Sequence, residues 1–398
     1  MKIERIRLKN FRVFQSLEIR NIPALAFFIG ANGVGKSTLF KLFGFLKDAL
    51  ENNVRTALQR EGGYREWVTR GHEKEPIEIE IQFRLEITGA NRLVTYLLVI
   101  GEEKGRPIVL REILRYKRSS SGAPYHFLDF SRGVGTAVNN EEDFSKTDEE
   151  LNREQQTLTT PDSLAIKGVG QFQRFKAAHA FSSLIENWHV SDFHIMAARQ
   201  RVEAGVAEHL SVTGDNLPLV VQHLYENHRD VFDIILDKMR RRVPGIANVE
   251  ANQTIDGHVV LSFRDGAFAD PFMARNVSDG TLKMFAYLVL LHDPKPHPFL
   301  CIEEPENQLY PELLNSLAEE LRDYACRGGQ VFVSTHAPEL LDSARIDEVF
   351  WLEKADGVTK VRRANDDPNI VALVEAGDPL GVLWSQGMFS APVVVQGR

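Results

Sequence analysis

An eight-residue stretch near the start of the chain has the residue types and spacing of a phosphate-binding loop. The sequence GANGVGKS at positions 30–37 fits the pattern G-x-x-x-x-G-K-[ST] at every constrained position. The apolar residues 24–29 predict a buried strand that enters this loop, and residues 37–50 predict a helix that leaves it. A chance glycine-rich turn is the alternative, but the strand–loop–helix setting favours binding of a nucleoside triphosphate.

The chemistry of such a loop assigns a role to its polar groups. Backbone N–H groups, aided by the helix dipole, would point at the anion. The Lys36 ammonium would reach the β- and γ-phosphates, and the Ser37 hydroxyl would ligate Mg²⁺. The expected nucleotide contacts in this stretch are Gly30, Asn32, Gly33, Gly35, Lys36, Ser37 and Thr38.

A second group of candidate residues follows much later in the chain. Residues 277–281, Val-Ser-Asp-Gly-Thr, precede an apolar helix that the sequence predicts over residues 282–291. This helix start, with Ser278, Asp279 and Gly280, would offer a hydroxyl and free N–H groups to an anion. A plain helix N-cap at Ser278 explains the same residues, and both interpretations stay open.

Two further apolar strands end in side chains that could act on a phosphate. Residues 299–302 run into Glu303 and Glu304, and residues 330–335 run into His336. A buried parallel strand that ends in two carboxylates places them at the ligand-binding edge of an α/β sheet. One carboxylate could hold Mg²⁺ while the next orients the attacking water, and the histidine could donate a hydrogen bond in the transition state. A solvated acidic loop and a histidine without a role are the alternatives.

The composition is that of a globular cytoplasmic protein with two or three domains. The 398 residues are 43% hydrophobic and 26% charged, so the chain as a whole is not disordered. No apolar run reaches the length of a membrane helix, so no membrane partner is expected. Cys301 and Cys326 predict buried thiols in a reducing compartment. The net charge of −8 gives no support for a broad nucleic-acid-binding surface.

Four motifs in order resemble the ABC-type ATPases of the RecF/SMC-like group. They are residues 30–37, 278–281, 303–307 and 334–336, and the opening RLKNFR at 7–12 is similar to theirs too. Within that group the chain most resembles stand-alone AAA-family ATPases related to the head of the overcoming-lysogenization-defect (OLD) family, without an evident Toprim domain. These carry an SDGTL element and an EPENxxxP element, here at 304–311.

The resemblance implies a fold and a division of the chain. The fold would be an α/β P-loop NTPase head of the ABC type, with a mixed sheet, an antiparallel β lobe and an inserted helical subdomain. Apolar and polar residues alternate strictly over residues 77–86, which independently predicts a strand in that lobe with one buried and one solvent-exposed face. Polar residues 139–162 predict an exposed or partly disordered insertion, and residues 171–188 and 217–242 predict helices. The expected divisions are 1–135 (N-terminal part of the head with the β lobe), 136–245 (polar insertion and helical lid) and 246–398 (C-terminal part of the head).

The resemblance also implies roles for individual residues. Lys36 and Ser37 would be phosphate-loop residues, Glu303 the Walker B acid and metal ligand, Glu304 the catalytic glutamate, and His336 the switch histidine. Residues 278–281 would form the signature motif, which in such ATPases completes the ATP site of a second head. Two departures stand out, since Glu303 replaces the usual Asp and the signature lacks the doubled glycine of transporter ATPases.

The predicted function is ATP hydrolysis with Mg²⁺ by a head-to-head homodimer, in DNA maintenance or anti-phage defence with a partner effector. A slow-turnover scaffold or sensor subunit of a defence complex is the alternative, whereas the long insertion before the signature disfavours a transporter motor. No nuclease activity is expected, because only about 60 residues follow His336. Two basic clusters are the candidates for DNA contact: Lys238 with residues 240–242, and Arg115 with Lys117 and Arg118. For the first cluster, positive charge at the C-terminal end of a helix is also explained by its favourable interaction with the helix dipole.

Overall fold

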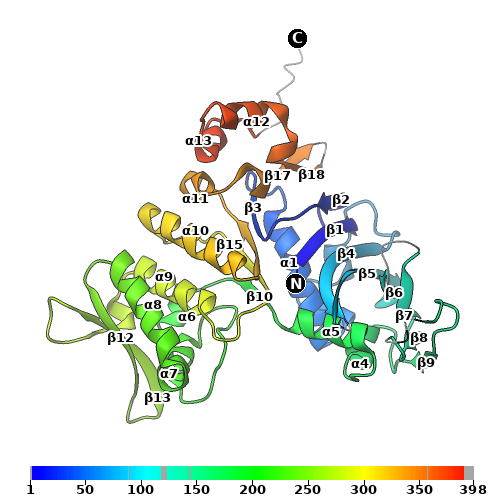
Figure 1. Ribbon diagram of the computed structural model, residues 1–398, viewed down its shortest axis with the longest axis horizontal. Coiled ribbons are helices and arrows are strands. Elements are labelled where there is room, and N and C mark those ends of the chain that lie inside the picture. Colours follow the sequence, from blue (N-terminus) through cyan, green and yellow to red (C-terminus); the bar gives the residue numbers. More distant parts are fainter. Residues whose placement is uncertain are drawn as a thin grey trace. The chain divides into compact units, whose positions relative to one another are not determined.

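The chain folds into two compact units, whose elements are drawn in Figure 1. The first unit comprises Met1–Trp188, Asp347–Asp367 and Phe389–Arg398, and the second comprises His189–Ile346 and Pro368–Met388. Each unit therefore combines segments that lie far apart in the sequence. The computed structural model describes residues 2–87, 89–117, 123–141, 143, 145–355 and 357–389.

An eight-stranded sheet dominates the first unit, and every neighbouring pair of strands in it is antiparallel (Figure 1). It is the antiparallel lobe that the alternating pattern predicts. In sheet order its strands are β2 (Phe14–Arg20), β1 (Lys2–Phe11), β4 (Ile77–Ile87), β5 (Ala90–Glu103), β6 (Arg106–Tyr116), β7 (Tyr125–Ser131), β8 (Val134–Val138) and β9 (Arg153–Thr157).

The apolar face of this sheet packs as the two-residue period requires. Ile79, Ile81 and Phe83 on β4 are fully buried, because alternate side chains point to the same face. The Phe83 ring stacks on Phe181 of helix α5 (Lys176–Glu186), with ring centroids 4.6 Å apart. Helix α5 therefore covers part of the apolar face and closes a core beneath it.

The opposite face of β4 is less exposed to solvent than the sequence predicts. The Glu80 residue is only 6% exposed, and its carboxylate lies 3.3 Å from Arg5, 3.4 Å from Arg7 and 3.7 Å from Arg115. A buried carboxylate is tolerated when opposite charges compensate the lost hydration. Because Arg115 is paired in this way, it is not a free phosphate-binding cation; Arg118 lies outside the described residues.

A smaller group of strands in the same unit carries the phosphate loop. Strand β3 (Leu25–Ile29) pairs in parallel with β17 (Val349–Ala355), which pairs antiparallel with β18 (Val358–Arg363). All five residues of β3 are buried, as an apolar run of this length predicts. The remaining helical elements of the unit are α1 (Lys36–Glu51), α2 (Val54–Gln59), α3 (Tyr64–Trp67), α4 (Ala165–Val169) and the 3₁₀ turn η3 (Ala364–Asp366).

The polar stretch 139–162 is largely exposed in its described residues, as predicted, but it contains regular structure that its composition does not suggest. Strand β9 pairs with β8 at the end of the large sheet, which requires backbone hydrogen bonds rather than apolar side chains. The Glu141 residue is 2% exposed, and both its carboxylate oxygens accept from the Ala177 N–H at 3.0 Å. A buried acid thus binds the start of α5, where the helix dipole favours negative charge.

The second unit contains the strands that carry the two carboxylates and the histidine. Strand β15 (Phe299–Glu303) pairs in parallel with β16 (Gln330–Ser334), and β10 (Trp188–Ser191) neighbours β15. The helical elements packed in this unit include α9 (Asp279–Leu291), α10 (Pro311–Cys326), α11 (Pro338–Asp342), α12 (Pro368–Glu375) and α13 (Leu380–Ser385), and the 3₁₀ turn η2 (Ile346–Glu348) lies at its boundary. Helix α9 is buried from Leu282 to Leu291, which explains its nearly continuous apolar sequence.

A second, smaller antiparallel sheet completes this unit. Strand β13 (His258–Asp265) pairs with β11 (Val202–Glu203), β12 (Ile246–Gln253) and β14 (Phe272–Met273). The predicted helix over 217–242 is two helices, because the backbone leaves the helical region at His228. The helical elements here are α6 (Ile195–Ala198), α7 (Leu217–Asn227), α8 (Arg229–Arg242) and the 3₁₀ turn η1 (Ala274–Asn276).

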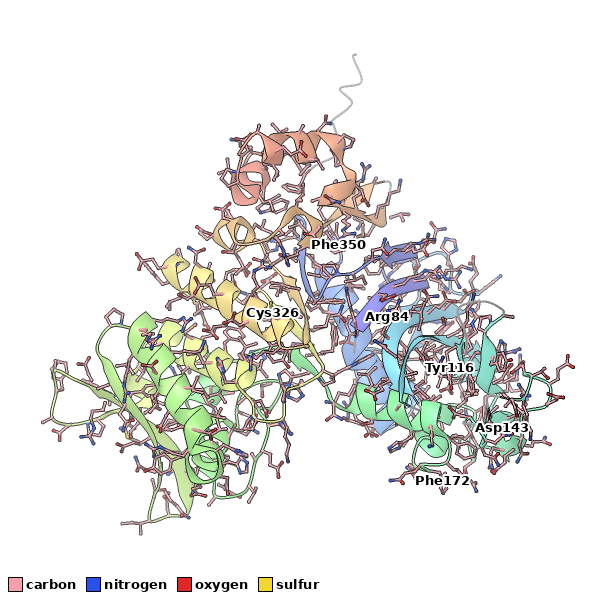
Figure 2. The ribbon with its side chains drawn as sticks, in the orientation of Figure 1. Arg84, Tyr116, Asp143, Phe172, Cys326 and Phe350 are labelled. Atoms are coloured by element: carbon pink, nitrogen blue, oxygen red, sulfur yellow. The ribbon has the colours of Figure 1, made fainter. Side chains whose placement is uncertain are left out.

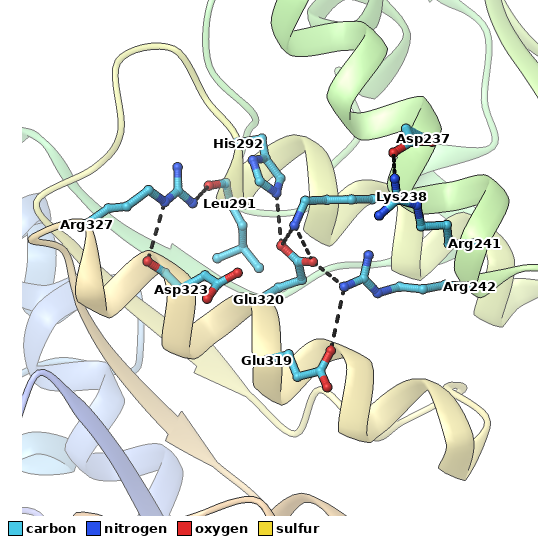
Figure 3. A network of polar contacts seen from close by, with 10 residues as sticks. All are labelled: Asp237, Lys238, Arg241, Arg242, Leu291, His292, Glu319, Glu320, Asp323 and Arg327. Carbon is cyan, nitrogen blue, oxygen red and sulfur yellow. Dashed lines mark hydrogen bonds and ion pairs between the residues drawn. The ribbon is translucent and has the colours of Figure 1, made fainter.

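One buried carboxylate ties three helices of the second unit together (Figure 3). Glu320 on α10 is fully buried and accepts from Lys238 Nζ at 2.7 Å and from the Arg242 guanidinium, both on α8. His292, which directly follows α9, contacts it at 2.9 Å. Nearby, Arg241 pairs with Asp237 and Arg240 donates to a backbone carbonyl. Two charges of this basic cluster therefore compensate Glu320 within the fold, while the Arg241 side chain stays 75% exposed, and contact with DNA stays a prediction.

The Glu320 network gives a matched pair of variants. Removing one partner of a buried ion pair costs about 3–5 kcal/mol, so we expect Glu320→Gln to lower the free energy of unfolding by that amount at neutral pH. Its neighbour Glu319 has a side chain that is 75% exposed, so Glu319→Gln should change stability by less than about 0.5 kcal/mol. Urea titrations measure both, and equal losses would show that the network does not stabilise the unit.

The same network predicts a direction for acid destabilisation. Burial alone would raise the pKa of Glu320, but hydrogen bonds from His292 and Lys238 and the charges of Arg242 and Lys238 lower it to about 2. Because the folded pKa lies below the unfolded one, this stability is complete above about pH 4.5 and is lost as the pH falls toward 2. The stability difference between wild type and Glu320→Gln should therefore shrink across this range.

Candidate nucleotide-binding site

The phosphate loop in the first unit adopts the backbone conformation that its glycines permit. Gly30 and Gly35 have φ angles of 151° and 107°, which side-chain-bearing residues rarely adopt. A Cβ atom on Gly35 would lie 2.7 Å from the Val13 side chain, and one on Gly30 would lie 2.6 Å from the Leu352 carbonyl oxygen. The loop therefore needs glycine at both positions for its turn and for close packing. Asn32, Gly33, Ser37 and Thr38 lie in the same loop or the first turn of α1, as predicted.

Lys36 begins helix α1, and its side chain folds back over the loop. Its Nζ donates to the carbonyl oxygens of Gly30 at 2.8 Å and Ala31 at 3.2 Å, and the residue is 6% exposed. The start of α1 at Lys36 also leaves the amides of its first turn without partners within the helix. A buried cation beside such amides suits a phosphate group, so these residues fit the predicted ligand.

The two carboxylates of the second unit lie where β15 ends. Glu303 is the last residue of the strand, and Glu304 has a left-handed backbone with φ of 41°. The Glu304 N–H donates to the Ser334 carbonyl at 2.9 Å, which attaches the turn to the end of β16. Non-glycine residues in this conformation carry strain and concentrate at functional sites. The backbone thus directs the Glu304 side chain away from the path of the strand.

The side chain of Glu304 has partners on both of its oxygens. Asn307 Nδ2 donates to Oε2 at 3.0 Å, and His336 Nε2 lies 3.5 Å from Oε1. The His336 N–H donates to Glu306 Oε1 at 2.6 Å, and the indole of Trp384 donates to the His336 carbonyl at 3.1 Å. These contacts fix the histidine backbone from two sides. The second unit therefore brings Glu304 and His336 together, as the sequence predicts.

The Nε2 atom of the His336 ring is buried and faces Glu304 Oε1 at 3.5 Å, a contact too long for a strong hydrogen bond. Within the part of the chain that the structure describes, this atom makes no hydrogen bond. An imidazole nitrogen in this situation can donate to, or accept from, a group supplied by a ligand or by water. This property fits the predicted contact with a phosphate oxygen.

Lys283 links the helix after the signature to the turn that carries Glu304. Its Nζ, on α9, donates to the Asn307 carbonyl at 2.6 Å. Burial lowers the pKa of Lys283 to about 8, although the charges of Glu306, Asp192 and Glu304 oppose the shift. The sequence gives no signal for this residue, because a lysine inside an apolar helix belongs to no motif.

At the start of α9, the structure supports the plain N-cap interpretation of Ser278 in local geometry. The Ser278 hydroxyl accepts from the Thr281 N–H at 3.2 Å, and the residue is exposed. The guanidinium of Arg199 forms an ion pair with Asp279 and donates to the Val277 carbonyl. The sequence gives no signal for this contact either, since Arg199 lies about 80 residues before residues 278–281. A capping role leaves a role in nucleotide contact open, because the helix start remains accessible.

The cap gives a stability prediction that is independent of ATP. We expect Ser278→Ala to lower the free energy of unfolding by about 1 kcal/mol, because one amide of the first turn loses its acceptor. Ser278→Asn should recover most of this loss, since asparagine is an equally good cap. Urea unfolding without nucleotide tests both variants, and an unchanged midpoint for Ser278→Ala would argue against the cap.

Residues 278–281, the predicted signature, open onto a hollow in the surface of the second unit. This hollow has a volume of about 640 Å³ and is lined by the end of α8, the start of α9 and the segment 308–313. Gly280 packs closely against this segment, since a Cβ there would lie 3.0 Å from the Gln308 carbonyl oxygen. Tyr310 on the rim is 67% exposed. The signature is therefore presented at an accessible surface.

Two remaining expectations concern the burial of the two cysteines and the presence of membrane-spanning helices. Cys301 on β15 is buried, and burial raises the pKa of its thiol. Cys326, at the end of α10 in Figure 2, is exposed, so the prediction of two buried thiols is wrong for this residue. Both thiols are free. No helix in the described segments has the length and apolar character needed to cross a bilayer.

The fold has clear structural relatives among the heads of SMC proteins. An SmcHead bound to the C-winged helix domain of ScpA matches with a TM-score of 0.54 and 14% identity, covering 91% of this chain and 97% of that one. An Smc head domain with an extended coiled coil, bound to the C-terminal domain of ScpA derived from Pyrococcus furiosus, matches with a TM-score of 0.53 and 13% identity, covering 94% and 99%. The protein thus has an α/β P-loop head fold of the SMC and ABC type, with mixed and antiparallel sheets.

The family follows from the sequence comparison. Residues 25–342 match the family described as "AAA domain, putative AbiEii toxin, Type IV TA system", and the chain belongs to this family of P-loop ATPases. It is also 31% identical over 150 residues to the DNA replication and repair protein RecF of Lactococcus lactis subsp. cremoris (strain MG1363). That match covers 35% of this chain and 40% of the relative's length.

Proposed function

We propose that this protein binds and hydrolyses ATP with Mg²⁺, that Lys36 binds phosphate, and that Glu304 and His336 take part in hydrolysis. The observation that carries the proposal is the arrangement at the end of β15, where a strained Glu304 is held beside His336. The glycine loop with its buried lysine is the proposed phosphate-binding element. Family membership supports nucleotide binding.

In the proposed reaction, Glu304 orients a water molecule and accepts its proton as that water attacks the γ-phosphate. Lys36 and the loop amides neutralise the phosphate oxygens as negative charge moves toward the leaving ADP. His336 Nε2, which makes no hydrogen bond and lies 3.5 Å from Glu304, would donate to an oxygen of the transferred group, and Trp384 and Glu306 keep its backbone in place. The products are ADP and inorganic phosphate.

Ser37 and Glu303 are the residues that would hold Mg²⁺. A hydroxyl and a carboxylate are oxygen donors, which this hard cation prefers. The ion would supply charge neutralisation for the β- and γ-phosphates. Glutamate at position 303 reaches one methylene further than the usual aspartate, so we expect contact through a different arrangement of water.

We further propose that ATP joins two copies of the protein head to head. The exposed Ser278 and the accessible hollow beside Gly280 would place the signature of one copy against the nucleotide of the other. A ligand that bridges two subunits stabilises the dimer by mass action, and its hydrolysis would release them. The solved SMC relatives are complexes with ScpA, which supports a protein effector as a further partner here.

The biological setting that we propose is DNA maintenance or anti-phage defence. The partial similarity to RecF supports the first, and the description of the family supports the second. Phosphate release and particle size, measured with and without ATP on the wild-type protein, test the enzymatic part. ATP-dependent dimers with sustained phosphate release would support the proposed ATPase, whereas dimers without release would favour the slow scaffold. If the protein shows no ATP-dependent dimers and no phosphate release, the proposal is wrong.

A further inference from the structure

The second unit contains a cluster of two histidines and an aspartate with the spacing of metal ligands. One ligand atom from each of His209, Asp293 and His297 lies within 4.8 Å of the others. His209 Nδ1 is 2.7 Å from Asp293 Oδ2, and the rings of His209 and His297 have centroids 5.2 Å apart. Among the described residues this is the one group of three His, Cys, Asp or Glu side chains arranged so.

The three side chains come from two connecting segments with restrained backbones. Asp293 and His297 lie in the connection between α9 and β15, where prolines at 294, 296 and 298 fix alternate φ angles. Asp293 Oδ1 accepts from the Lys295 N–H at 2.8 Å, and the Tyr324 hydroxyl donates to the His297 carbonyl. His209 precedes α7, and its carbonyl accepts from Asn216 at 2.9 Å. Prolines and hydrogen bonds therefore restrain both segments without any ligand.

Burial within the cluster suits a cation with an entry path. The side chain of Asp293 is 4% exposed and His297 is 9% exposed, while the side chain of His209 is 38% exposed. A buried carboxylate requires compensation by positive charge or hydrogen bonds. An ion could reach Asp293 and His297 from solvent along the partly exposed side chain of His209.

We propose that His209, Asp293 and His297 bind a divalent first-row transition metal ion of the Zn²⁺ class. Imidazole nitrogens and a carboxylate oxygen are ligands that Zn²⁺ prefers, with bonds of about 2.0–2.2 Å. Tetrahedral ligands at such distances lie about 3.3 Å from each other, so the side chains need shifts of only about 1 Å. The buried His189, whose ring stacks on His297 with centroids 4.8 Å apart, supports that imidazole from behind.

The position of the cluster indicates a structural role for the metal. His297 lies two residues before β15, and Glu303 lies at the far end of this five-residue strand. At about 3.3 Å per residue the strand separates the cluster from the carboxylates by more than about 13 Å. The ion would therefore join the segment before α7 to the start of β15 and take no part in phosphate chemistry.

The test uses the full-length protein without a histidine tag, stripped of metal and titrated without nucleotide. We expect one Co²⁺ per chain, detected by its visible absorption, and a rise in melting temperature on adding Zn²⁺. His209→Gln and Asp293→Asn should each weaken binding at least about 100-fold, because each removes a direct ligand. Since His209 is partly exposed, its variant should fold, and circular dichroism of the metal-free proteins checks this.

The matched control is His258→Gln. His258 also lies beside an aspartate, with Nδ1 3.3 Å from Asp256 Oδ2, but it belongs to no three-ligand group. It should bind Co²⁺ and Zn²⁺ as the wild type does, and so should Glu304→Gln, which reports on the carboxylates at β15. Absence of stoichiometric binding in the wild type would overturn the proposal. So would binding that survives unchanged in both His209→Gln and Asp293→Asn.

Discussion

Glu304→Gln is expected to lower the rate of ATP hydrolysis by about 10²–10⁴-fold while leaving ATP binding intact. Glutamine keeps the size of the side chain and can still accept from Asn307, but it cannot take a proton from water. Because ATP then persists, dimers that form on ATP should accumulate and become visible by light scattering after gel filtration. Steady-state phosphate release and nucleotide affinity complete the measurement.

Glu319→Gln is the matched control for this prediction. Its carboxylate lies on α10 of the same unit, largely exposed, and has only a distant contact with Arg242 at 3.9 Å. Its hydrolysis rate and particle size should equal those of the wild type. If Glu304→Gln hydrolyses ATP as fast as the wild type, the catalytic role of Glu304 is wrong. If both proteins release almost no phosphate but still dimerise, the scaffold interpretation becomes the better one.

Lys36→Ala is expected to weaken ATP binding by roughly 10- to 150-fold and to abolish measurable hydrolysis. A hydrogen bond to a charged group contributes about 1.5–3 kcal/mol to binding. A free-energy change of about 1.4 kcal/mol equals a factor of ten in the dissociation constant. Loss of the cation also removes stabilisation of the charge that develops on the phosphates. A fluorescent ATP analogue measures the affinity, and phosphate release measures the rate.

Lys41→Ala on the same helix is the control for charge and for helix α1. Lys41 Nζ contacts Glu61 at 2.8 Å, and its side chain is 40% exposed, so its removal should change stability little. ATP affinity should be unchanged in this variant. Equal affinity of Lys36→Ala and wild type would mean that the glycine loop is not the ATP site, whatever the rate of hydrolysis.

The sequence could predict the elements whose signals are local. The glycine loop sits between a buried strand and a helix because each of the three carries its own pattern, and the alternation around Phe83 defines one sheet face unambiguously. The apolar run before Glu303 likewise predicts where β15 ends. Roles of the residues in ATP chemistry remain predictions, since they depend on a ligand and on a second copy of the chain.

Features that depend on distant partners could not be predicted in this way. Glu80 looks solvent-facing in sequence, yet arginines from β1 and β6 bury it. The positive charges at the end of α8 resemble a phosphate-binding patch until Glu320, about 80 residues later, is seen to neutralise two of them. The contact of Arg199 with Asp279 is equally remote in sequence. Such ion pairs arise from tertiary packing, and the spacing of residues along the sequence does not predict them.

The outer strand of the large sheet has a consequence for self-association. Strand β9 ends the order of eight strands, and its sequence Arg-Glu-Gln-Gln-Thr leaves no side chain buried. Arg153 and Glu154 form ion pairs with Asp148 and Arg174, which keeps charge along this margin. Charged residues on an edge strand discourage another polypeptide from extending the sheet. We therefore expect this margin of the β lobe to resist fibril-like stacking of one copy of the protein on another.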